Sequence, residues 1–194
     1  MIILPFLALY ILAQARGCVS RVSNRTIDDF NGDEVTGVVP VYIPANRWNV
    51  KSNCTACHVQ PQQDQAIDNT WHDTTVPAGT TYSVTLEFTG TAIYFFGIVP
   101  NSLPKTQTHV NLAFSLDGAS AGTYVHTPDS TSNTILYSVP LFAKDRLSNE
   151  PHTLVAQAQS SSLLIFDFAL YTCVDCENCV FHRDLTVELG LMMG

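Results

Sequence analysis

The segment from Thr81 to Val99, TYSVTLEFTGTAIYFFGIV, constrains the fold of this chain more than any other stretch. In its first half, polar residues alternate with apolar or aromatic residues that fall on one side of the strand, namely Tyr82, Val84, Leu86 and Phe88. A strict period of two is typical of a strand with one buried face. Gly90 permits a tight reversal, and the almost unbroken apolar run 92–99 is typical of a strand covered on both faces. We therefore predict that the two halves form the core hairpin of a β-sandwich.

Strand patterns continue towards the C-terminus. Residues 110–116 alternate, Asp117-Gly118 supplies a turn, and 122–127 would return as a hairpin partner. Further strand-like segments follow at the spacing of an all-β sandwich: 135–139, 152–158 and 163–171. The last has Leu164, Phe166, Phe168 and Leu170 on one face and Asp167 on the other. The predicted fold over residues 19–172 is an antiparallel two-sheet jelly-roll sandwich of about eight strands.

Composition limits the classes of partner. The chain has 194 residues and 46% hydrophobic content, enough for one self-sufficient core. Only 13% of residues are charged, the formal net charge is -8, and no basic patch occurs. These features argue against nucleic acid and anionic membrane surfaces as partners.

The N-terminus predicts secretion. Residues 1–15 hold an apolar run from Ile2 to Ala13 and a small-x-small end at Ala13-Gln14-Ala15, typical of a signal peptide. An uncleaved anchor stays open because no basic residue precedes the run. Sequons at Asn24 and Asn53 predict N-glycosylation, and no later segment is apolar and long enough to span a bilayer. We expect a secreted or cell-surface glycoprotein.

Cysteines mark a long irregular segment, 49–79. In an oxidising compartment we expect a disulfide between Cys54 and Cys57. The alternatives are haem attachment at C-x-x-C-H, a thioredoxin-like redox pair, or a zinc site shared with cysteines of the tail, which are Cys173, Cys176 and Cys179. The tail, 173–194, has no place in the sandwich pattern.

The turn after residue 27 carries oxygen ligands at alternate positions, Asp29, Asn31 and Asp33. This arrangement resembles the start of a calcium loop, but Pro40 stands where the bidentate Glu would be. A solvated acidic turn is the favoured interpretation, with structural calcium as the alternative. No other cofactor is expected.

Two aromatic motifs suit sugar contacts. Sugar rings have apolar faces that stack on aromatic side chains, whereas their hydroxyls bond to polar groups. Trp48, and Trp71 with the adjacent His72 and Asp73, combine both characters. The alternative for each Trp is a place in the core.

The case for catalysis is weak. Histidines are scattered, the G-x-S-x-G nucleophile motif is absent, and no spacing singles out a carboxylate pair. We expect no enzyme.

Several short runs, taken together, carry a family resemblance. They are Arg25-Thr26-Ile27-Asp28-Asp29, Asn53-Cys54-Thr55-Ala56-Cys57, Thr70-Trp71-His72-Asp73, Phe88-Thr89-Gly90-Thr91-Ala92-Ile93-Tyr94, Phe114-Ser115-Leu116-Asp117-Gly118 and Phe166-Asp167-Phe168-Ala169-Leu170-Tyr171-Thr172. Residues 22–172 resemble uncharacterised secreted and surface proteins of mushroom-forming fungi. That resemblance implies a galactose-binding-like jelly roll, the fold of many carbohydrate-binding modules.

The expected function is a secreted, non-catalytic carbohydrate-binding module whose partner is a carbohydrate or cell-wall polysaccharide. One alternative is a structural or adhesive surface protein that acts through protein contacts and disulfides. The other is a metal-dependent enzyme.

Overall fold

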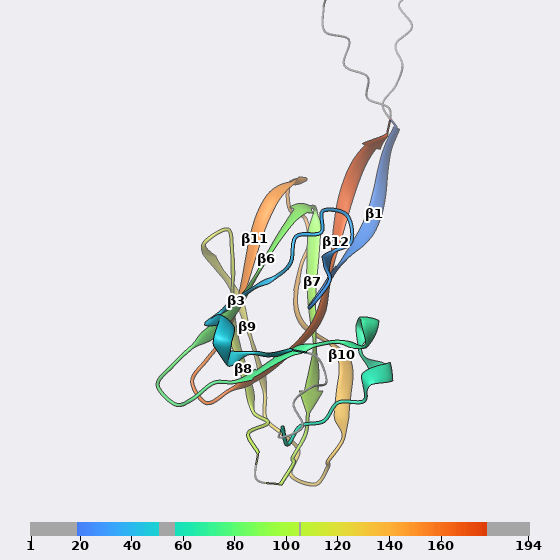
Figure 1. Ribbon diagram of the computed structural model, residues 1–194. Coiled ribbons are helices and arrows are strands. Elements are labelled where there is room, and N and C mark those ends of the chain that lie inside the picture. The colour runs from blue at the N-terminus through green and yellow to red at the C-terminus, as the bar shows by residue number, and fades with distance from the viewer. Residues whose placement is uncertain (1–18, 51–56, 105, 178–194) are drawn as a thin grey trace, which may run out of the picture. The chain divides into compact units, whose positions relative to one another are not determined.

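The computed structural model describes residues 19–50, 57–104 and 106–177, and these form two antiparallel sheets packed face to face (Figure 1). The first sheet has the strand order β10-β7-β12-β1-β2, with β5 also paired to β12 and β4 paired to β5. Its strands are β1 (Val19–Asp28), β2 (Gly32–Asp33), β4 (Asn49–Val50), β5 (His72–Thr75), β7 (Ala92–Pro100), β10 (Ile135–Lys144) and β12 (Leu163–Glu177). The second sheet, in order, contains β3 (Val41–Ile43), β6 (Tyr82–Gly90), β11 (Glu150–Ala158), β8 (Val110–Leu116) and β9 (Ala119–His126).

The all-β, antiparallel two-sheet sandwich is confirmed. The described residues contain twelve strands where about eight were expected. Part of the difference is β2 and β4, which have two residues each and are too short to show a pattern. Residues Val22–Val174 make up one compact unit.

The main core lies between the sheets and follows the predicted alternation. Val84, Leu86 and Phe88 of β6 are buried and pack with aromatic side chains of the facing sheet. Phe95 and Phe166, for example, are stacked with ring centroids 4.4 Å apart. Burial of such side chains contributes about 1.5–3 kcal/mol each.

The predicted hairpin at Gly90 is wrong, although both of its strands exist. β6 pairs with β3 and β11, whereas β7 pairs with β10 and β12 in the other sheet. The chain therefore crosses between the layers at Gly90. A Cβ atom on this residue would clash with the backbone carbonyl oxygen of Thr172. The hairpin predicted at Asp117-Gly118 is confirmed, because β8 and β9 pair across it.

A bulge in β12 changes which residues face the core. Phe166 and Phe168 pair with consecutive residues of β7, so Asp167 is the extra residue. Leu164 and Phe166 belong to the main core before the bulge, and Ala169 and Tyr171 after it. The prediction that one face runs from Leu164 to Leu170 is therefore wrong beyond Phe166.

A second, smaller core covers the outer face of the first sheet. Its buried members are Ala66, Trp71, Ile98, Leu163 and Ile165. The segment from 57 to 71, which includes the 3-10 helices η3 (Gln63–Gln65) and η4 (Ile67–Asn69), supplies part of this cover. The backbone N–H of Gln62 donates to the Tyr137 hydroxyl at 2.6 Å and ties this segment to β10.

Candidate functional site

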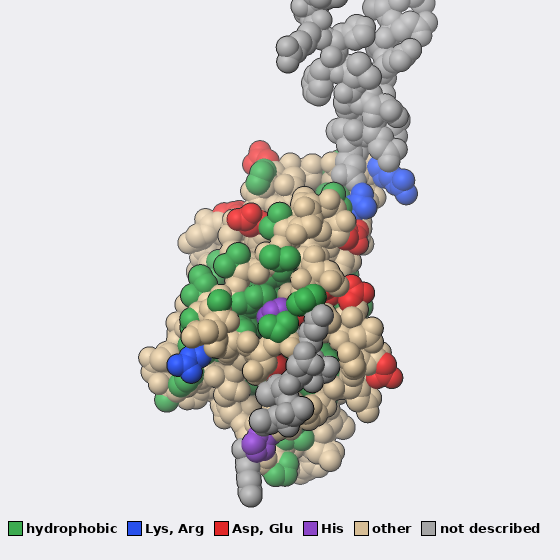
Figure 2. All heavy atoms as spheres, viewed as in Figure 1, with side chains coloured by type: hydrophobic (Ala, Val, Ile, Leu, Met, Phe, Trp, Pro, Cys, Tyr) green, Lys and Arg blue, Asp and Glu red, His purple; other side chains and the backbone are tan. Residues whose placement is uncertain are grey.

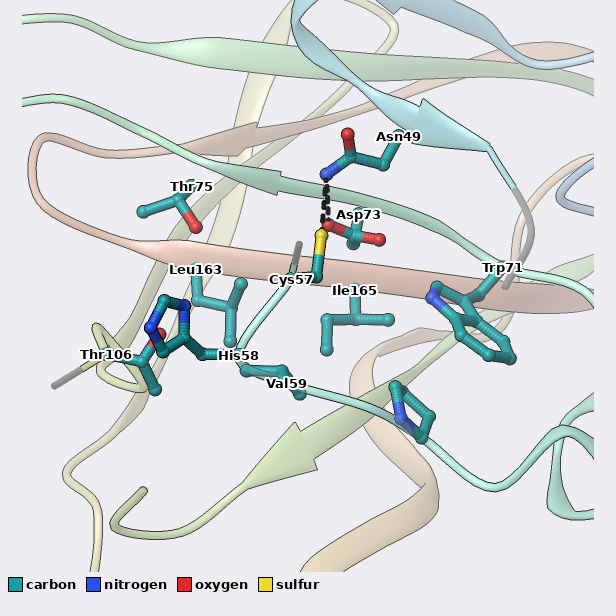
Figure 3. Close-up of a pocket in the computed structure, with 11 residues that line it drawn as sticks. Asn49, Cys57, His58, Val59, Trp71, Asp73, Thr75, Thr106, Leu163 and Ile165 are labelled. Atoms are coloured by element: carbon teal, nitrogen blue, oxygen red, sulfur yellow. Dashed lines mark hydrogen bonds between the residues drawn. The ribbon is translucent and has the colours of Figure 1, made fainter. Parts of the chain in front are cut away.

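A pocket of about 150 Å³ lies beside this outer core, between the sheet face and the segment after Cys57 (Figure 3). Strands β4, β5 and β12 carry five of its lining residues, and Trp71 directly precedes β5. The segment 57–61 and Thr106 complete the lining. The lining residues are Asn49, Cys57, His58, Val59, Pro61, Trp71, Asp73, Thr75, Thr106, Leu163 and Ile165.

The alternation of β5 explains which residues reach the pocket. Trp71, Asp73 and Thr75 are separated by two positions and all line it. The side chains between them, His72 and Thr74, are buried on the other side of the strand. Trp71 and Asp73 were predicted as sugar contacts and are brought together here. Thr75 was missed, although the same period of two identifies it.

Asp73 is held in place by its neighbours. Its Oδ2 atom accepts a hydrogen bond from Asn49 Nδ2 at 2.8 Å, and the Trp71 side chain also bonds to it. Burial raises the pKa of the Asp73 carboxyl, and the bonds from Asn49 and Trp71 act against that shift. Ionised carboxylates accept about four hydrogen bonds, so Asp73 keeps acceptor capacity for a ligand.

The remaining surface of the pocket is apolar on one side and polar at its rim. Leu163 and Ile165 form the floor, and Trp71 lies at one end while His58 and Thr106 lie at the other (Figure 3). Among the described lining residues none is Lys or Arg, and Asp73 is the one acidic side chain. Sequence reasoning did not identify Leu163, Ile165 or Thr106, because only the tertiary fold brings them here.

The other two predicted sugar contacts lie elsewhere. Trp48 is buried in the main core, and its ring centroid is 4.9 Å from that of Tyr42. His72 is also buried, stacked on Tyr42 with centroids 3.9 Å apart. Its Nδ1 atom lies 2.6 Å from Asp29 Oδ2. A sugar contact at either residue stays a prediction, but neither lines the pocket.

The three predicted calcium ligands point to different partners. Asp29 binds His72 and also accepts from Thr70 Oγ1 at 2.6 Å. Asp33 accepts from the Tyr171 hydroxyl at 2.9 Å, and Asn31 Nδ2 donates to Asp68 at 3.3 Å. Within the described part of the chain, no group of three or more His, Cys, Asp or Glu side chains is arranged to hold a metal ion. Calcium here stays a prediction.

Two buried carboxylates near this turn have an oxygen without a hydrogen-bond partner, Asp28 Oδ2 and Asp167 Oδ2. The other oxygen of Asp167 accepts from the Ile67 N–H at 3.0 Å. Burial raises the pKa of Asp167 to about 7, and the charges of Asp29, Asp28 and Asp68 add to the shift. Burial also raises the pKa of Asp28.

Several predictions concern residues that lie partly outside the described ranges. Cys54 and Asn53 lie there, so the Cys54–Cys57 disulfide and one glycosylation site stay predictions, as do the signal peptide 1–15 and most of the tail 173–194. Asn24 is exposed on β1, and its side-chain oxygen accepts from Thr172 Oγ1 at 2.8 Å. In the described ranges, no helix has the length and apolarity that a membrane crossing requires.

No protein-family model and no curated protein matches the chain. Solved structures show distant similarity. The Agl-KA catalytic domain is 13% identical with a TM-score of 0.43, over 88% of this chain and 30% of that one. TmCBM61 in complex with β-1,4-galactotriose is 10% identical with a TM-score of 0.34, over 78% of this chain and 87% of that one.

A Paenibacillus sp. cycloisomaltooligosaccharide glucanotransferase complexed with cycloisomaltoheptaose is 14% identical with a TM-score of 0.42, over 63% of this chain. The similar part spans 16% of that enzyme and 17% of a GH115 4-O-methyl-α-glucuronidase. TM-scores this low carry no argument, so the fold class is assigned from the two sheets of this chain itself.

Proposed function

We propose that this chain is a secreted, non-catalytic module that binds carbohydrate in the pocket between β4, β5, β12 and residues 57–61. One observation carries the proposal. The pocket places the Trp71 indole beside a carboxylate, Asp73, that Asn49 holds at 2.8 Å.

This combination suits a sugar. Trp71, Leu163 and Ile165 give the pocket an apolar wall, which the C–H groups of a pyranose can contact without open stacking because these side chains are almost fully buried. Asp73 and Asn49 offer an acceptor and an amide for its hydroxyl groups. Ligand sites of this kind are mostly apolar, with a few well-placed polar groups that fix orientation.

The carboxylate count supports binding without hydrolysis. Glycoside hydrolysis generally uses two carboxyl groups on opposite sides of the scissile bond. Asp73 is the one carboxylate among the described lining residues. Asp29, on the other side of the sheet, is bound to His72 and Thr70.

The test is retention of the full chain on a panel of insoluble plant and fungal polysaccharides, with Asp73→Asn and Asn49→Ala as site variants. Thr123→Ala, at an exposed position on β9 of the other sheet, is the matched control. We expect both site variants to lose at least about tenfold in affinity, equal to 1.4 kcal/mol, without a change in circular dichroism. Equal retention of all four proteins would overturn the proposed site.

An adhesive protein is a second candidate because the edge strand β3 carries exposed apolar side chains. Val41 and Ile43 are each 55% exposed, and Val38 and Val39 precede them with 45% and 53%. Contiguous exposed apolar residues mark protein contacts more often than scattered ones do. Concentration-dependent self-association in sedimentation velocity that Val41→Lys abolishes would favour this candidate.

A further inference from the structure

We infer that the pocket receives a single uncharged sugar residue, at a chain end or on a branch. This inference rests on the proposed function and narrows it. It separates the site from a groove that follows a polysaccharide main chain and from a site for acidic sugars.

The first argument is volume. The pocket offers about 150 Å³. A protein cavity of about 150 Å³ is known to hold one benzene molecule, a single six-membered ring. A hexopyranose has about twice as many non-hydrogen atoms as benzene, so the pocket has room for no more than one sugar residue, and each further residue of an oligosaccharide projects into solvent.

The second argument is shape. Trp71 closes one end of the pocket, and His58 with Thr106 flanks the other (Figure 3). Trp71 is only 3% exposed because it is packed into the outer core, so it does not form an open stacking platform. A polysaccharide that passes through the site needs a pocket that is open at two ends, whereas a terminal sugar residue needs a pocket that is open at one.

The third argument is charge. Asp73 is partly buried in the pocket, and none of the described lining residues is Lys or Arg. The face of the molecule seen in Figure 2 also carries few basic side chains. A uronate placed beside Asp73 would bring two like charges close together with no cation to offset them. A neutral sugar meets no such cost.

The test is calorimetric titration of the full chain with three sets of probes. These are methyl glycosides of glucose, galactose and mannose, oligosaccharides of two to six residues from β-1,3-glucan and β-1,4-galactan, and the methyl glycosides of glucuronic and galacturonic acid. We expect the Kd of each bound oligosaccharide to lie within about threefold of its matching methyl glycoside, and uronides to bind at least about tenfold more weakly than their neutral counterparts.

Two variants test the charge argument. Asp73→Asn removes the like charge, so it should lower the ratio of the uronide Kd to the Kd of the matching neutral sugar. Thr75→Lys, at an exposed lining position, supplies a cation and should raise uronide affinity even if Asp73→Asn does not fold.

The outcomes separate the two proposals. Affinity that rises tenfold or more from the methyl glycoside to the tetrasaccharide, or uronides that bind as tightly as neutral sugars, would overturn this inference and leave carbohydrate binding intact. Binding of no saccharide in any set would overturn both.

Discussion

The Nδ1 atom of His72 lies 2.6 Å from Oδ2 of Asp29, and both side chains are buried between the sheets. Thr70 Oγ1 donates to the other oxygen of Asp29 at 2.6 Å, and the Tyr42 hydroxyl donates to its backbone carbonyl at 2.7 Å. These contacts join the end of β1 to the start of β5. Asp29 therefore stabilises the strand that carries the pocket residues, without lining the pocket itself.

Replacing Asp29 by Ala should be strongly destabilising, because His72 and Thr70 would lose a buried partner. We expect the free energy of unfolding in urea to fall by about 2–5 kcal/mol, because each of these two buried groups left without its partner costs about 1–3 kcal/mol. Asp64→Ala, at an exposed position in η3, is the control and should change it by less than about 0.5 kcal/mol. A change of similar size in both variants would contradict the structural role of Asp29.

The buried carboxyl of Asp167 should make stability depend on pH. Its pKa is raised from 3.8 to about 7 in the folded state, so the folded protein retains a proton that the unfolded chain releases. Stability should therefore fall as pH rises from about 4 to 7, by up to about 1.4 kcal/mol per pH unit. Asp167→Asn should reduce this slope, leaving the part that comes from the raised pKa values of Asp28 and Asp73, and should be more stable than the wild type at pH 8.

Urea unfolding across this pH range, with a chelator present, measures the slope. Parallel curves for the wild type and Asp167→Asn would contradict the assignment. Repeating the series with calcium in place of the chelator tests the sequence prediction of a structural cation. A cation bound near the acidic turn would favour ionised carboxylates and reduce the slope.

His152 and Asp117 should stabilise the protein in a different pH range. Their side chains are 2.7 Å apart, and His152 Nε2 lies 2.9 Å from the Ser148 carbonyl oxygen. Burial disfavours the charged imidazole, but the bonds to Ser148 and Asp117 outweigh it and raise the pKa of His152. Bonds from the Thr153 N–H and from His152 lower the pKa of Asp117.

The raised His152 pKa contributes stability below its unfolded value of 6.5, and the lowered Asp117 pKa contributes above its unfolded value of 3.8. His152→Gln should therefore cost most near pH 5, where the imidazole is charged and bonded to Asp117. It should cost least near pH 8, because the imidazole loses its charge as the pH rises. Thermal melts of variant and wild type at both values measure this. A larger cost at pH 8 would contradict the charged pair.

Local patterns predicted much of the fold, because the period of two in a strand depends only on neighbouring residues. Val84, Leu86 and Phe88 are buried as that period requires. The partner of each strand depends on distant residues, and so β6 and β7 were wrongly paired. The bulge at Asp167 reverses the pattern in mid-strand, and no local signal marks it.

The candidate site was half predictable for the same reason. Trp71 and Asp73 lie on the same side of β5 and reach the pocket together, whereas His72 between them is directed into the core. Because side chains alternate along a strand, the period of two predicts that Trp71 and Asp73 share one side of β5 and that His72 faces the other. Leu163 and Ile165 come from the far end of the chain, and only sheet pairing between β5 and β12 places them beside Asp73.

The most direct test of the pocket uses the two tryptophans of the chain as separate reporters. Trp48 lies in the main core, where its indole Nε1 has no hydrogen-bond partner, so Trp48→Phe breaks no hydrogen bond and should cost about 1–3 kcal/mol through the small cavity that it leaves. Trp71 is then the sole indole. Titrating this variant with a polysaccharide-derived sugar that the wild type binds should give a saturable change in fluorescence with an unchanged Kd. No change in Trp48→Phe, with a full response in Trp71→Phe, would show that carbohydrate binds elsewhere.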